Sequence, residues 1–85
     1  MVLLAITEAG LQDALRLGNE NGPAIWCGAD AISDTDYASL KRAGVSRFIY
    51  PLSGEHSDVL AGAIETIREH HPGESIWVEG GANEL

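Results

Sequence analysis

Cysteine and basic side chains are scarce in this sequence, and each scarcity excludes a class of protein. Cys27 is the single cysteine among 85 residues, so an internal disulfide and a cysteine-rich zinc site are both excluded. A chain without disulfides suits a reducing compartment, and we expect a cytoplasmic protein. Lysine and arginine number 5 against 13 aspartates and glutamates, which gives a net charge of −8. Such a chain lacks the basic surface that binds nucleic acids or anionic membranes.

Long apolar runs and phosphate-binding motifs are also missing. No apolar run approaches the ~20 residues that span a bilayer. The apolar residues 2–6 follow no basic segment and lead directly into a helix cap, so they predict a strand and not a secretion signal. Neither GxGxxG nor the phosphate-binding GxxxxGK pattern occurs. We therefore expect no nucleotide and no other cofactor.

Short apolar runs alternate with segments whose apolar residues recur at helical spacing. The runs predict strands at residues 2–6, 24–28, 47–52 and 75–79, and the spacing predicts helices at residues 8–18, 34–44 and 55–71. Thr7 and Ser33 are the expected N-caps of the first two helices. Gly44 is the expected end of the second helix, and Pro51 ends the third strand because proline cannot donate to a ladder.

This alternation predicts a single α/β domain over residues 1–85, with four mostly parallel strands and three helices. The first strand is the most apolar and should be central, which favours the strand order 2-1-3-4. In that order one face of the sheet would be covered by the first helix alone. The residues that we expect in the strand cores are Leu3, Leu4, Ala5, Ile25, Cys27, Phe48, Ile49, Ile76 and Val78. Trp26 and Trp77 are expected to pack among these aliphatic residues, with a pocket lining as the alternative.

Acidic residues gather where the predicted strands end, which is the edge at which open parallel sheets usually bind ligands. The basic residues, including Arg47, are expected on helix bodies or towards the opposite edge. Hard oxygen ligands for Mg²⁺ or Ca²⁺ could come from Asp30, Asp34, Asp36, Glu55 and Glu79. The alternative is that these acids only complement helix dipoles, because each junction from strand to helix is also a helix N-terminus.

Catalytic candidates are few. Glu55 and His56 could act as a hydrolytic pair beside Ser53 or Ser57, although neighbours within one turn rarely reach the geometry of a nucleophile with its base. Cys27 is followed by no anion cradle and no arginine, so it is interpreted as a buried structural cysteine.

These observations predict a small non-enzymatic module that acts by protein association, as a regulatory or accessory domain. The alternative is a small metal-dependent or hydrolytic enzyme that uses the acidic edge. We expect a homodimer or a protein partner, because an incompletely covered sheet would leave an apolar patch in water. The predicted edge strands, residues 24–28 and 75–78, also lack the internal lysine or proline that commonly protects an edge.

Overall fold

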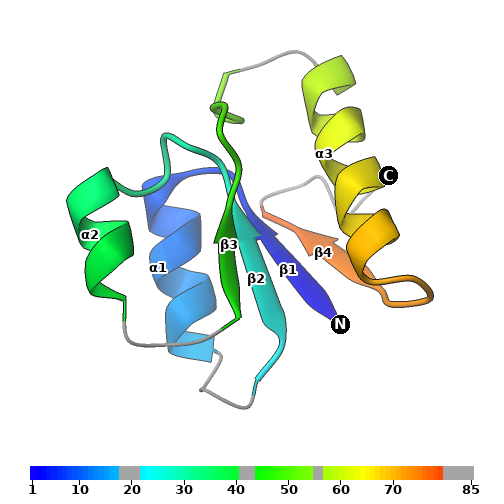
Figure 1. Ribbon diagram of the computed structural model, residues 1–85, viewed down its shortest axis with the longest axis horizontal. Helices are drawn as coiled ribbons and strands as arrows, with labels where there is room; N and C mark the ends of the chain where they lie inside the picture. Colours follow the sequence, from blue (N-terminus) through cyan, green and yellow to red (C-terminus); the bar gives the residue numbers. More distant parts are fainter. Residues whose placement is uncertain (18–21, 41–43, 55–56, 80–85) are drawn as a thin grey trace.

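The computed structural model describes residues 1–17, 22–40, 44–54 and 57–79. Within these residues, helices and strands alternate in the predicted order (Figure 1). The elements are β1 (Val2–Ala5), α1 (Glu8–Leu17), β2 (Ala24–Cys27), α2 (Asp34–Ser39), β3 (Val45–Arg47), α3 (Ser57–His70) and β4 (Ile76–Val78). The predicted α/β class is confirmed, and β1, β2 and β4 lie where they were expected, shortened by one or two residues.

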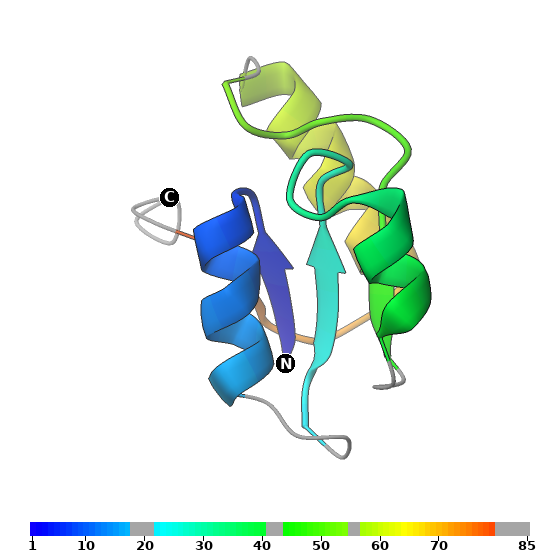
Figure 2. The ribbon, with the colours of Figure 1, turned by 90° about the vertical axis from the view of Figure 1, so that its left-hand side faces the viewer.

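The described strands form one parallel sheet in the order β3-β2-β1-β4. The predictions of a parallel sheet and of a central β1 are confirmed, but the order 2-1-3-4 is wrong. The short helices α1 and α2 both lie on one face of the sheet, so β2 and β3 are added in the same direction. The longer α3, with 14 residues, lies across the other face (Figure 2) and returns the chain so that β4 lies beside β1 (Figure 1). The face with a single helix is therefore covered by α3 and not by α1.

Side-chain caps begin the first two helices, as the sequence predicts. The hydroxyl of Thr7 accepts a hydrogen bond from the Gly10 N–H at 3.1 Å, and the hydroxyl of Ser33 accepts one from the Asp36 N–H at 3.1 Å. The predicted end of the second helix is wrong. The helix ends at Ser39, and the Leu40 N–H closes a tight last turn by bonding to the Tyr37 carbonyl.

The third strand is also displaced from its prediction. It runs from Val45 to Arg47, because the chain leaves the sheet soon after the Phe48 N–H bonds to the Cys27 carbonyl at 2.8 Å. Beyond Phe48, the Tyr50 carbonyl accepts a hydrogen bond from the N–H of Ala29, which lies in the loop after β2. Ile49 consequently lies outside the sheet and is 95% exposed, so its predicted place in the core is wrong.

The apolar core lies on both faces of the sheet, and β1 contributes to each side. The face under α3 buries Val2, Leu4, Phe48, Leu52, Ala63, Ile67 and Val78. The face under α1 and α2 buries Ala5, Leu11, Ala14, Ile25, Cys27, Ala31 and Ile32. Of the other predicted core residues, Leu3 and Ile76 are partly buried. None of the helices in the described part of the chain has the length and apolar character of a bilayer span.

Candidate functional site

The strand order reverses between β1 and β4: β2 and β3 are added on one side of β1, and β4 is added on the other. Parallel α/β proteins usually bind ligands at such a point, at the carboxyl ends of the strands. The N-terminus of α1 lies at this position. Its free backbone N–H groups and its dipole would favour an anion there.

A carboxylate of the chain itself occupies this position. Glu79, which follows β4, accepts hydrogen bonds from the backbone N–H groups of Ile6 and Thr7, both at 2.6 Å, and from the Thr7 hydroxyl. Gly10 makes this approach possible, because a Cβ at that residue would collide with the Glu79 carboxylate. Glu79 therefore joins the end of β4 to the start of α1, and these bonds occupy both of its oxygens.

The other carboxylates predicted as metal ligands are dispersed along this edge. Asp30 accepts from the Leu52 N–H at 3.2 Å, and Asp34 pairs with Arg47. Asp36 is exposed in the first turn of α2. Among the residues that the structure describes, no three histidine, cysteine, aspartate or glutamate side chains form a group that could hold a metal ion. Glu55 and His56 lie outside the described residues.

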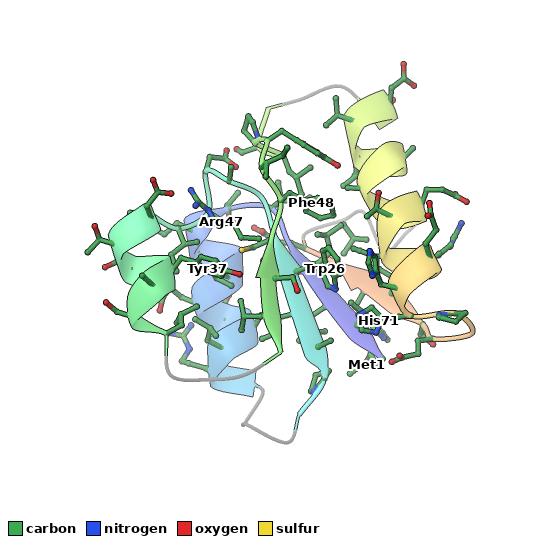
Figure 3. The ribbon with its side chains drawn as sticks, in the orientation of Figure 1. Met1, Trp26, Tyr37, Arg47, Phe48 and His71 are labelled. Atoms are coloured by element: carbon green, nitrogen blue, oxygen red, sulfur yellow. The ribbon has the colours of Figure 1, made fainter. Side chains whose placement is uncertain are left out.

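Arg47 lies at the carboxyl edge, which corrects the expectation that basic residues avoid it. Its guanidinium bonds to the Ala29 carbonyl at 2.9 Å, pairs with Asp34, and lies 5.9 Å from the centre of the Tyr37 ring (Figure 3). A polar pocket of about 460 Å³ adjoins it and is also lined by Glu8 and Asp30. The sequence misplaced Arg47 because it was assigned to the beginning of a strand that it in fact ends.

Cys27 lies in the core below this edge. Burial raises the pKa of its thiol to about 11, although the nearby Arg47 acts in the opposite direction. The thiol is therefore protonated at neutral pH and is a poor nucleophile, since the reactive species is the thiolate.

A different site appears beside β4, on the face that α1 and α2 cover. A groove of about 160 Å³ runs between α1, β1 and β4, and its walls include Leu3, Ala14 and Trp77. Trp77 is 51% exposed, so the prediction that it packs in the core is wrong. The physical reason is the strand order: α1 and α2 contribute to a core over β1, β2 and β3, and that core does not include Trp77 on β4.

Trp26, by contrast, is partly buried and packs against the core under α3. It lies on the opposite face, where its ring centre is 5.1 Å from that of Phe48, and its indole Nε1 donates to Nε2 of His71 at 3.2 Å (Figure 3). The contrast between the two tryptophans could not be read from their similar sequence surroundings, because it depends on which strand lies at the edge.

The outer side of β4 has no strand beside it among the described residues, because β4 pairs with β1 alone. The prediction of an edge strand is therefore right for β4 and wrong for β2, which lies between β1 and β3. We call the outer edge of Ile76–Val78, together with the groove that holds Trp77, the β4 surface.

No protein-family model matches this chain, and the searches of curated proteins and of solved structures found no match either. The residues themselves carry the argument about function.

Proposed function

We propose that the protein is a non-enzymatic association module, regulatory or accessory in role, and that it binds protein through the β4 surface. The observation that carries this proposal is Trp77, a large aromatic side chain half exposed on an edge strand. Tryptophan is among the residues most enriched at the centres of protein interfaces. The binding partner would be a second copy of the chain or a different protein in the cytoplasm.

The energetics of the β4 surface support protein binding. Covering the exposed half of the Trp77 side chain removes roughly 100 Å² from water, which contributes about 2–3 kcal/mol. An added strand would also pair the free backbone groups along the outer side of β4, the mode in which many domains bind extended segments. A protein strand can supply both contributions at once.

The acidic edge gives less support to the alternative, a metal-dependent or hydrolytic enzyme. Three of its carboxylates already have partners within the chain: Glu79 on α1, Asp30 on the Leu52 N–H, and Asp34 on Arg47. A metal ion would have to displace the bonds of Glu79, which occupy both of its oxygens, and would compete with the partners of Asp30 and Asp34. The thiol of Cys27 is buried and protonated, so it does not supply a nucleophile. The net charge of −8 supports a protein partner over a nucleic acid or an anionic membrane.

Trp77→Lys tests the proposal, with Ile49→Lys as the matched control because Ile49 is also an exposed apolar residue. The two variants and the wild-type chain would be immobilised as baits in native cytosol, and the affinity of each retained protein would then be measured with purified components. We expect the wild-type chain and Ile49→Lys to bind the same proteins, including free copies of the chain, and Trp77→Lys to lose them. Equal binding by all three baits would contradict the proposal.

A further inference from the structure

We propose, building on the association function above, that the occupant of the β4 surface is a second copy of this chain. The two β4 strands would pair antiparallel about a two-fold axis at Trp77. This arrangement joins the two sheets into one continuous sheet.

The direction of the backbone groups in β4 defines the free edge. The Ser75 carbonyl accepts from the Val2 N–H at 2.8 Å, and the Glu79 N–H donates to the Leu4 carbonyl at 2.9 Å. Both residues therefore direct their bonding groups towards β1. Because these groups alternate along a strand paired in parallel, Trp77 also faces β1, and Ile76 and Val78 present their N–H and C=O groups to the free edge.

That pattern is self-complementary. In an antiparallel pair centred on Trp77, Ile76 lies opposite the partner's Val78, and Val78 lies opposite the partner's Ile76. Each of these pairs can exchange two N–H to C=O bonds, so every outward group of this three-residue strand is satisfied. No other register centred within β4 uses all of the outward groups.

The side chains fit the same symmetry. Trp77 is the middle residue of β4 and would lie directly opposite the partner's Trp77, at the position where no backbone bonds cross and side chains approach most closely. The two rings would lie on the same face, next to each other and to the groove beside α1. Aromatic pairs across antiparallel strands stabilise a sheet beyond the area that they bury.

Charges at the two ends of β4 do not block this approach. Glu79 is turned onto the start of α1. Glu74 is held by the Met1 amino group at 2.8 Å and by His71 at 3.2 Å. The net charge of −8 per chain opposes association, but the Debye length of ~8 Å at physiological salt screens much of it.

Sedimentation equilibrium of the full chain, from micromolar to millimolar protein, tests the pairing. We expect the mass to rise from 9.0 kDa towards twice that value, and the dimer to tighten as salt is added. Trp77→Lys places like charges opposite each other at the axis and should weaken the dimer at least ~100-fold. Ile49→Lys, with the same change of charge, should leave it intact. Circular dichroism would establish that both variants are folded.

A disulfide trap tests the register. Under mild oxidation Trp77→Cys should form a covalent dimer rapidly, because the two thiols would meet at the axis, whereas Ile49→Cys and the buried Cys27 should not. Equal rates for Trp77→Cys and Ile49→Cys, or a dimer that survives Trp77→Lys, would overturn the proposed pairing.

Amide hydrogen exchange separates this proposal from the association function. A chain that stays monomeric, with fast exchange at Ile76 and Val78, has an open edge; that result would overturn the two-fold dimer and leave binding to a different protein intact. A monomer in which both amides are protected has its edge covered within the chain. That second result would overturn the dimer and the association function together.

Discussion

Removing the Glu79 carboxylate should destabilise the protein strongly, because this side chain accepts three hydrogen bonds that join β4 to the start of α1. In Glu79→Ala, the N–H groups of Ile6 and Thr7 and the Thr7 hydroxyl lose their acceptor. Hydrogen bonds to a charged group contribute about 1.5–3 kcal/mol each when buried. Because Glu79 is only half buried, water can replace part of each bond, and we take about 1 kcal/mol for each. The expected loss is therefore about 3 kcal/mol.

A loss of that size is large for a small domain. A free-energy change of 1 kcal/mol shifts the melting temperature of a chain this size by roughly 4–8 °C, so Glu79→Ala should melt about 12–24 °C below the wild-type chain. Glu79→Gln keeps an acceptor oxygen but loses the charge, and should lie between the two. Differential scanning calorimetry and urea unfolding would measure both variants.

The matched control is Glu69→Gln, which changes an exposed glutamate on α3. It should alter stability by no more than about 0.5 kcal/mol. If Glu79→Ala were as stable as this control, the reasoning that Glu79 joins β4 to α1 would be refuted. If Glu79→Gln were as unstable as Glu79→Ala, the oxygen acceptor would matter less than the charge.

Two further predictions concern Cys27 and the acidic edge. Burial raises the pKa of the Cys27 thiol from 9.0 to about 11. Its contribution to stability is therefore complete well below pH 9 and falls as the pH rises from 9 to 11. The free energy of unfolding should fall by about 2–3 kcal/mol in total over that range. Cys27→Ala should abolish this fall when urea unfolding is measured from pH 9 to 11. An equal fall in the wild-type chain and in Cys27→Ala would contradict the assignment to Cys27. Titration with Mg²⁺ or Ca²⁺ should produce only weak, non-saturating shifts of the amide signals of residues 30–36, and saturation at sub-millimolar metal would favour the enzyme alternative.

The sequence determined the fold class well because its signals are local. The apolar residues 2–6 predicted a strand buried on both faces, and Thr7 and Ser33 could be recognised as caps from their own spacing. Strand order is not local. The strand order depends on α1 and α2 lying on the same face of the sheet, which no single segment of the sequence reveals.

Two features of the candidate site depend on such long-range information. Trp77 appeared to be a core residue because its strand resembles the one that contains Trp26, and the difference between a central strand and an edge strand is set by the whole sheet. The hydrogen bonds that Glu79 accepts come from Ile6 and Thr7, which precede it in the sequence by 73 and 72 positions. The glycine at residue 10, in the first turn of α1, was the available signal for that close contact.

The most direct test of the central claim is amide hydrogen exchange at Ile76 and Val78 as a function of protein concentration. If the free edge of β4 binds a second copy, both amides should exchange quickly in dilute protein and become protected as the concentration rises. The amides of Trp77 and Glu79, which face β1, should remain protected throughout. Exchange at Ile76 and Val78 that stays fast from micromolar to millimolar protein would contradict the account.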